Sequence, residues 1–495
     1  MQTLRRVVSN TVISLFGQVI TWTSTFLLTI AYGRFLGDTK FGELYFALSF
    51  VALIGFPIEF GFNQQLTRDV AQQPERARRY LANTLALKIL FWLPLYSIIL
   101  SVCWALGYSA EQRTLVAICG LTLLSTAITN TFASLHYAYE RVVFPVVGTV
   151  LEKGFGAIAG FILLKLGYSV EVMAFVLLCS SLANSLWQST WFFRLVGVHL
   201  KLNRAIMRDL LLTGIPFLLY GVLGVIYYRL DTVLLSLMTN TTVVGWYGAA
   251  YRLFDTLVFL PNLVISAIMY PVFSRLSVNS QAHLKVAIEK SLNFLLFCGL
   301  PLATIMITAA PNIIGFLYHR AEFVQSVPVL QALAPGLVFL YINTVLSTCI
   351  ISIKKEKKIT IMAAAALVFN LTSNVILIPH LQHIGAAIVT SLTELLLLCI
   401  GIAFVPRELR PTGSVLVGLK ALIASLAMAL IILPLGTFPI YIIVPVALPA
   451  YLLVATLLRA IPREDMLALY SAVRHKAQRH GSASTLVEEA EQRRS

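Results

Sequence analysis

Residues 9–32 read SNTVISLFGQVITWTSTFLLTIAY and contain no Asp, Glu, Lys or Arg. A helix that crosses a bilayer needs about 20 mostly apolar residues, and lipid favours helices because they satisfy their own backbone hydrogen bonds. The stretch is therefore predicted to be a transmembrane helix. It is too long and too polar for the apolar core of a cleaved signal peptide, and it lacks a clean cleavage site of small residues. We expect it to remain part of the protein.

Stretches of the same kind continue along most of the chain. Of its 495 residues, 58% are apolar and 12% are charged, and the mean hydropathy is +0.84. The polar segments between the apolar stretches are too short to fold as a soluble enzyme domain. The sequence therefore predicts an all-α polytopic membrane protein. About fourteen transmembrane helices are expected, at residues 9–32, 41–61, 80–106, 114–138, 142–164, 172–193, 210–238, 243–270, 286–310, 328–352, 359–379, 384–404, 415–436 and 439–458.

The basic residues alternate between the loops on the two sides of the predicted membrane. The net charge is +15; because Lys and Arg concentrate in cytoplasmic loops, this charge does not indicate nucleic-acid binding. The even-numbered loops contain Arg68, Arg76, Arg78, Arg79, Arg141, Arg194, Lys201, Arg204, Arg208, Arg275, Lys285, Lys354, Lys355, Lys357, Lys358, Arg407 and Arg410. The odd-numbered loops contain little beyond Arg34, Lys40, Arg113, Lys165 and Arg320. We therefore expect both termini in the cytoplasm and an even number of helices.

The chain repeats itself at an interval of about 200 residues. Residues 36–45 open the second predicted helix as residues 239–247 open the eighth, and Leu93-Pro94-Leu95 corresponds to Leu300-Pro301-Leu302. Six helices separate equivalent points, so the two copies are related by an axis along the membrane normal. The predicted units are an N-lobe of six helices at 1–205, a C-lobe of six at 206–405, two further helices at 406–460, and a cytoplasmic tail at 461–495 that begins with an amphipathic helix.

These repeated segments resemble a known family. Arg34-Phe35-Leu36-Gly37, Phe41-Gly42 and Tyr45 are similar to the first-loop motif of bacterial polysaccharide flippases. The later pattern is similar as well, with Asn370, Asn374, Leu377-Ile378-Pro379 and Gly385-Ala386-Ala387. The superfamily also includes multidrug and toxin extrusion transporters and the peptidoglycan lipid flippase. The resemblance implies two six-helix bundles around a central cavity, and an oligosaccharide on a polyprenyl diphosphate as cargo.

Predicted spans seven and eight carry the densest set of charges expected inside the membrane. They form a hairpin about Asn240, so Arg229 and Arg252 are expected at the same level, each roughly 13 Å from the outer end. Asp231 lies near that height, and Asp255 lies on the same helix face as Arg252. One interpretation is two internal Arg–Asp pairs that neutralise each other. The other is that at least one arginine faces the cavity and binds the diphosphate, because a guanidinium binds phosphate oxygens bidentately and keeps its charge.

The first predicted span has a polar stripe, whose members recur every three or four residues and so share one helix face: Asn10, Ser14, Gln18, Thr21, Thr25 and Thr29. Small polar residues either mediate tight helix packing in lipid or form a wetted wall; Gln18 favours a wall that contacts sugar. Tyrosines are candidates for stacking on sugar rings. The predicted substrate-binding residues are therefore Arg229, Arg252, Gln18, Thr25, Tyr220, Tyr227 and Tyr251.

Three carboxylates are candidates for a coupling proton or sodium ion, because charges inside a bilayer usually mark transport pathways. They are Asp231, Asp255 and Glu59. We expect Lys88 to extend toward the inner surface, and the other intramembrane charges, Glu152, Lys153 and Glu394, to be structurally paired. Apart from such a coupling ion, no cofactor is predicted. No metal site is predicted either, since the six cysteines fall inside spans without close pairing.

The expected function is that of a flippase, not an enzyme. It would move a polyprenyl-diphosphate-linked oligosaccharide from the inner to the outer leaflet of a bacterial or archaeal cytoplasmic membrane, by alternating access. The cargo would serve O-antigen, capsule or cell-wall biogenesis, with membrane lipids and polysaccharide-assembly proteins as partners. One alternative is a cation-coupled multidrug exporter on the same fold, and a second is a membrane glycan polymerase or ligase. No Gly-x-x-x-x-Gly-Lys-Ser/Thr loop is present, so ATP is not expected to drive the chain directly.

Overall fold

The computed structural model describes residues 2–197, 201–264 and 269–460, without the side chains of residues 2–8, 11, 219, 220, 223, 259, 263 and 264. The regular structure in these ranges is helical throughout. The α-helices are α1 (Gln2–Gly55), α2 (Phe62–Gln72), α3 (Ala77–Ala105), α4 (Ala110–Ala138), α5 (Val143–Lys165), α6 (Val170–Val196), α7 (Arg204–Met238), α8 (Thr241–Leu257), α9 (Phe259–Val264), α10 (Tyr270–Asn279), α11 (Gln281–Thr308), α12 (Ala310–Tyr318), α13 (Ser326–Ser352), α14 (Glu356–Phe404), α15 (Ser414–Ile432) and α16 (Ile440–Leu457). The tail predicted at 461–495 lies outside the described residues.

The membrane-spanning capacity of the helices agrees with the predicted fold class. Ten helical stretches in the described residues are long and apolar enough to cross a bilayer. Two of them, Val12–Ile58 and Glu356–Phe404, each contain two predicted spans. Predicted span seven falls in α7 and span eight in α8 and α9, which are outside those ten. The structure therefore confirms an all-α polytopic membrane protein without fixing the number of spans at fourteen.

Two long helices are each broken by one residue. In α1 the break is at Gly37, with φ 79° and ψ 177°, a conformation that glycine adopts without steric cost. In α14 the break is at Gln382, with φ 47° and ψ −126°. Both residues lie between predicted spans, so the chain reverses direction there with almost no loop. The sequence boundaries and the helix bounds differ for this reason.

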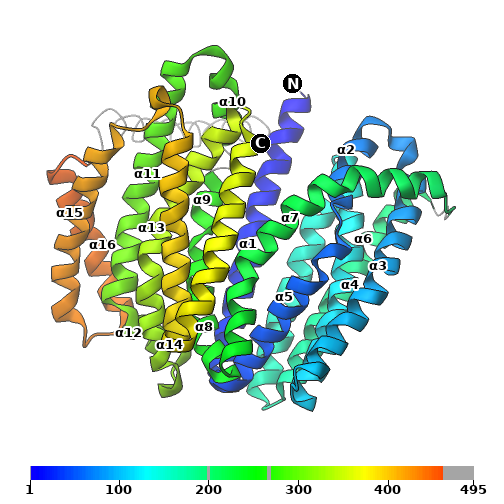
Figure 1. The fold of residues 1–495 in the computed structure, drawn as a ribbon, viewed down its shortest axis with the longest axis horizontal. Coiled ribbons are helices and arrows are strands. Elements are labelled where there is room, and N and C mark those ends of the chain that lie inside the picture. The colour runs from blue at the N-terminus through cyan, green and yellow to red at the C-terminus, as the bar shows by residue number, and fades with distance from the viewer. Residues whose placement is uncertain (1, 198–200, 265–268, 461–495) are drawn as a thin grey trace, which may run out of the picture.

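The helices form two bundles that diverge toward the end where the N-terminus lies (Figure 1). In one bundle α1 packs on α4 and α5, and α4 packs on α3 and α6; in the other, α13 packs on α8, α11 and α14. The long helix α7 contacts both, with α14 on one side and α1, α2 and α3 on the other. The helices α15 and α16 pack on each other beside α11, at the edge of the molecule (Figure 1).

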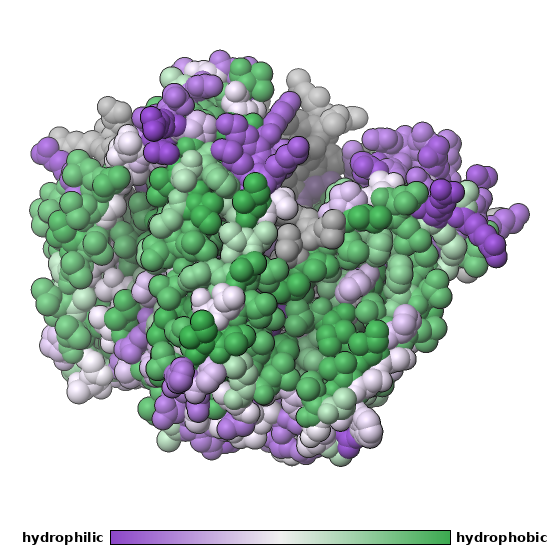
Figure 2. Space-filling model, in the orientation of Figure 1, coloured by the Kyte–Doolittle hydropathy of each residue, from purple (hydrophilic) through white to green (hydrophobic). Residues whose placement is uncertain are grey.

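The outer surface of the described residues is apolar around the middle of the molecule. Figure 2 shows hydrophobic residues in a broad band along the helices, with hydrophilic residues gathered at the two ends. Large apolar side chains such as Leu186 and Leu430 are exposed. A soluble protein rarely exposes so large a contiguous apolar area, so the band is the surface that lipid covers. The chain is an integral, multi-pass membrane protein.

Candidate functional site

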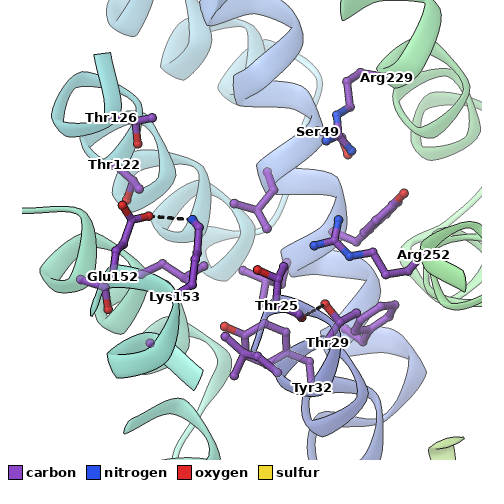
Figure 3. Close-up of a pocket in the computed structure, with 18 residues that line it drawn as sticks. Thr25, Thr29, Tyr32, Ser49, Thr122, Thr126, Glu152, Lys153, Arg229 and Arg252 are labelled. Carbon is purple, nitrogen blue, oxygen red and sulfur yellow. Dashed lines mark hydrogen bonds and ion pairs between the residues drawn. The ribbon is translucent and has the colours of Figure 1, made fainter. Parts of the chain in front are cut away.

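A cavity of about 300 Å³ lies between the two bundles. Figure 3 shows its side chains, which come from α1, α4, α5 and α6 on one side and from α7 and α8 on the other. The second bundle contributes two lining residues, and both are arginines. The lining residues are Thr25, Leu28, Thr29, Tyr32, Phe41, Leu44, Tyr45, Leu48, Ser49, Thr122, Thr126, Glu152, Lys153, Gly156, Leu177, Ser180, Arg229 and Arg252.

The two arginines end in the same cavity but differ in their partners. Arg252 forms an ion pair with Asp255, with 3.5 Å between Nη1 and Oδ2, and both groups are partly exposed. Within the described part of the chain, Arg229 forms no ion pair. The pairing of Arg229 with Asp231 that one of the two interpretations required is absent there, because the carboxylate of Asp231 is buried among other partners. One positive charge in the cavity is therefore left for an anionic ligand.

The polar stripe of α1 is only partly directed at this cavity. Thr25 and Thr29 line it, whereas Gln18 is exposed and is not among the lining residues. The threonine hydroxyls donate hydrogen bonds to carbonyl oxygens one turn earlier, from Thr25 to Thr21 at 2.8 Å and from Thr29 to Thr25 at 2.8 Å. Such back-bonds leave the oxygen lone pairs available as acceptors. The stripe thus presents a lightly polar wall rather than a row of free donors.

A second, smaller cavity of about 250 Å³ adjoins the central one between α1 and α8. Trp22 and Phe26 of α1 give it an apolar side. Thr25 and Arg252 line both cavities. A ligand on Arg252 therefore has a second space beside it, bounded by the helix pair that joins the two bundles.

The predicted tyrosines are not part of the central cavity lining. Tyr227 lines a different cavity, of about 250 Å³, between α7, α13 and α14, and its hydroxyl donates a hydrogen bond to the carboxylate of Glu394. Tyr251 is buried and stacks on Tyr247 with 5.3 Å between ring centroids. Tyr220 belongs to α7, and its side chain is outside the described residues. The expectation that Tyr227 and Tyr251 face the central cavity is therefore corrected: a hydrogen bond and a stacked ring hold them inside the second bundle.

Asp231 is the centre of a buried polar cluster in the second bundle. Asp231 is 4% exposed. It accepts hydrogen bonds from Asn374 Nδ2 at 2.8 Å, Thr390 Oγ1 at 2.9 Å and the Tyr247 hydroxyl at 3.2 Å. Asn374 also donates to Asn370 Oδ1 at 3.0 Å, while its own Oδ1 is buried without a partner. The cluster contains several oxygen atoms and no cationic side chain.

Glu59 is held in the first bundle by a fully buried lysine. Lys88 Nζ lies 2.7 Å from Glu59 Oε2 and also donates to Asn63 Oδ1 at 3.0 Å and to the Ala127 carbonyl at 2.8 Å. Asn63 and Asn130 donate further hydrogen bonds to the Glu59 carboxylate, at 2.6 and 2.9 Å. The expectation that Lys88 extends toward the membrane surface is wrong, because these acceptors anchor it inside the bundle.

The two bundles are in close contact at one end of the molecule. We call this end the closed end and define it by the residues Gly37, Gly42, Thr242, Gly245 and Tyr318. Thr39 Oγ1 lies 3.0 Å from Thr242 Oγ1, and Trp246 Nε1 donates to Asp38 Oδ2 at 2.8 Å. Arg34 donates to the carbonyls of Leu317 and Phe316, and Arg320 donates to the carbonyl of Arg34 at 2.7 Å. These contacts seal the cavity on the side of the odd-numbered loops.

Comparison with known families identifies the chain. A model described as a polysaccharide biosynthesis protein matches residues 7–277, and a model described as the lipid II flippase MurJ matches residues 194–459. Each match covers more than half of the 495 residues. The chain belongs to the polysaccharide biosynthesis protein family. The resemblance inferred from the motifs is thereby confirmed, and this family member is a membrane transporter rather than an enzyme.

Individual relatives are distant. The family member is 21% identical over 373 residues to the probable low-salt glycan biosynthesis flippase of Haloferax volcanii. The aligned region covers 74% of this chain and 77% of the relative. Its fold is similar to the lipid II flippase MurJ in an inward closed conformation, with a TM-score of 0.71, 17% identity and coverage of 93% of this chain and 100% of the other.

Multidrug transporters share the fold less closely. An inward-facing multidrug resistance transporter gives a TM-score of 0.65 at 16% identity, covering 78% of this chain and 96% of the other. An outward-facing multidrug transporter gives a TM-score of 0.54 at 15% identity. That match covers 80% of this chain and 93% of the other. At these identities the structures establish the fold alone.

Proposed function

We propose that the chain is a flippase that moves a polyprenyl-diphosphate-linked oligosaccharide from the inner to the outer leaflet of a bacterial or archaeal cytoplasmic membrane. The observation that carries this proposal is the pair of arginines, Arg229 and Arg252, that ends in one cavity between the bundles. Arginine keeps its charge when desolvated and binds two phosphate oxygens at once. A diphosphate is an anion that two arginines on facing helices can share.

The depth of the arginines suits a ligand that crosses the membrane. Arg229 lies nine residues before the end of α7 at Met238, which is roughly 13 Å along a helix, close to half of a bilayer core about 30 Å thick. A charge at that depth costs about 2.5–3.5 kcal/mol on insertion scales. Placing an unpaired guanidinium there is reasonable only if water or an anion reaches it, which the cavity allows.

The small cavity between α1 and α8 gives the lipid chain a place beside the diphosphate. Trp22 and Phe26 are apolar and border the same space as Arg252. With the diphosphate on Arg252, the polyprenyl chain lies toward these residues and the surrounding lipid. The oligosaccharide then occupies the central cavity.

The direction of transport follows from the predicted orientation. The closed end carries the odd-numbered loops, which are poor in basic residues and are expected outside the cell. The cavity then opens toward the cytoplasm, at the end where the two bundles diverge (Figure 1). Moving two negative charges outward is also favoured by the membrane potential, by about 2.3 kcal/mol per charge per 100 mV.

The cluster around Asp231 is the proposed site of a coupling sodium ion. Oxygen ligands from carboxylate, amide and hydroxyl groups suit a hard cation, and the unpartnered Oδ1 of Asn374 fits that role. The other candidates are already neutralised, Glu59 by Lys88 and Asp255 by Arg252. Binding of the ion would bias α7, which carries both Asp231 and Arg229, and so would link the ion to the cargo.

A drug exporter on the same fold is the second candidate, favoured by the similarity to multidrug transporters. The two are separated by reconstituting the full chain in liposomes with a fluorescent polyprenyl-diphosphate disaccharide in both leaflets. Flipping is read from the label that a membrane-impermeant quencher reaches. We expect the protein to make the inner pool accessible, and to leave ethidium transport at the level of empty liposomes. Ethidium transport without flipping of the lipid would overturn the proposal.

A further inference from the structure

An ion pair on α5 faces the two arginines across the cavity. Glu152 Oε1 lies 2.6 Å from Lys153 Nζ, and both residues line the central cavity (Figure 3). The side chain of Lys153 is 40% exposed and that of Glu152 is 14% exposed. They lie in the middle of α5 (Val143–Lys165), where charges are costly unless they serve a ligand or a partner.

The carboxylate of Glu152 is held in place from behind. Asn184 of α6 donates to Glu152 Oε2 at 2.7 Å, and Gln188 donates to Asn184 Oδ1 at 2.9 Å. Asn184 and Gln188 are buried at 3% and 1% exposure. The position of Asn184 depends on Gly148, one turn before Glu152, because a Cβ on Gly148 would overlap Asn184 Oδ1. A chain of buried amides thus fixes the orientation of a carboxylate at the cavity surface.

The surroundings of the pair add hydroxyl groups and free space. Thr122, Thr126 and Ser180 line the same side of the cavity, and each hydroxyl keeps acceptor capacity beyond its protein hydrogen bond. Gly156, one turn after Glu152, also lines the cavity and has no side chain to fill it. This side of the cavity therefore contains several fixed donors and acceptors in a recess.

We propose that Glu152 and Lys153 form the sugar-recognition site of the cavity and bind the hydroxyl or acetamido groups of an uncharged sugar next to the diphosphate. The inference rests on the proposed function, since the arginines would hold the diphosphate opposite. A carboxylate accepts hydrogen bonds from sugar hydroxyls, and an ammonium donates to their oxygens. Because the pair has no net charge, it suits a neutral ring that both donates and accepts, rather than an acidic sugar.

The experiment compares two short lipids of equal charge on the purified full chain in detergent. One is farnesyl diphosphate esterified with N-acetylglucosamine. The other is farnesyl diphosphate esterified with a methyl group in place of the sugar. The measured quantity is the ratio of their dissociation constants by isothermal titration. In the wild type we expect the sugar lipid to bind at least about tenfold more tightly, since hydrogen bonds to charged groups are the stronger ones.

The variants separate recognition of the sugar from binding of the diphosphate. Glu152→Gln and Lys153→Met should bring the ratio near one. Each variant also changes the net charge of the cavity and so shifts the affinity for both diphosphates, which is why the ratio is the measured quantity. Lys153→Arg, which keeps the charge and donors, should retain the preference. Glu43→Gln is a matched control, because Glu43 also pairs with a lysine, Lys40, at 3.2 Å, but outside the cavity.

Two outcomes would overturn the inference: a ratio near one in the wild type, or a wild-type ratio in Glu152→Gln and Lys153→Met, with or without an equal loss of affinity for both lipids. Failure of the proposed function looks different. It would appear as unchanged affinity for the methyl ester in Arg229→Gln and Arg252→Gln, whatever the ratio.

Discussion

Gly42 of α1 and Gly245 of α8 bring two helix backbones into direct contact at the closed end. A Cβ on Gly42 would lie 2.7 Å from the backbone nitrogen of Gly245 and would overlap the carbonyl of Thr241, and a Cβ on Gly245 would overlap the carbonyl of Asp38. The two glycines occupy equivalent positions of the predicted internal repeat.

Because any side chain at these glycines forces the backbones apart, Gly42→Ala and Gly245→Ala should each prevent full closure. We expect the flipping rate in proteoliposomes to fall at least about tenfold, while the protein remains folded, because sealing of the closed end is one of the two alternating states. Gly315→Ala is the control, since a Cβ there meets nothing within 4 Å. Normal flipping by both glycine variants would show that this contact is not part of the cycle.

Thr39 and Thr242 provide a reversible test of the same end. Their hydroxyl oxygens are 3.0 Å apart, so the double variant Thr39→Cys/Thr242→Cys should form a disulfide on oxidation. We expect oxidation to stop flipping and a reductant to restore it, because the bundles must separate there to release cargo outward. The measurement is flipping by one sample before oxidation, after it and after reduction, with the oxidised wild type as reference. Full activity of the crosslinked protein would exclude opening at this end.

Removal of the charge at Asp231 should uncouple transport from sodium. We expect wild-type flipping to rise with sodium at constant ionic strength and pH, and Asp231→Asn to show no such dependence, because the neutral amide weakens binding of a cation in the buried cluster. Asp255→Asn is the matched control, since its carboxylate is partly exposed and pairs with Arg252. A sodium dependence that survives in Asp231→Asn would rule out this site.

The ion pair of Glu59 and Lys88 should matter for stability rather than for transport. Lys88→Met leaves a carboxylate without its cation, and breaking a buried pair from one side typically costs about 3–5 kcal/mol. The double variant Lys88→Met/Glu59→Gln should recover much of that loss. Thermal unfolding of the three proteins in detergent tests this, with flipping measured below the lowest midpoint. A double variant no more stable than Lys88→Met would contradict the expectation.

The sequence predicted some features of the site because they depend on local geometry. Arg229 and Arg252 line one cavity, and a hairpin with a turn near Asn240 and a fixed rise per residue predicts that they lie at similar depth. The fold class and family follow in the same way from apolar runs and from the motif that contains Gly37 and Gly42, where the backbone needs glycine.

Other features were not predictable, because the partners are far apart in the chain. Asp231 is bonded by Asn374 and Thr390, 143 and 159 residues later, so the hairpin geometry suggested Arg229 as its partner instead. Glu152 and Lys153 look like an ordinary adjacent pair in the sequence. Only the packing of α5 on α1 and α6, across the cavity from the arginines, places them there.

The most direct test of the proposal is the flipping rate of the double variant Arg229→Gln/Arg252→Gln in proteoliposomes, normalised to folded protein. Each lost charge-assisted contact is worth at least about 1.5 kcal/mol, so we expect a decrease of roughly a hundredfold or more, with each single variant in between. Asp255→Asn should retain activity, since it removes a competitor for Arg252. A double variant that folds and flips the lipid at the wild-type rate would contradict the proposed binding of the diphosphate by these arginines.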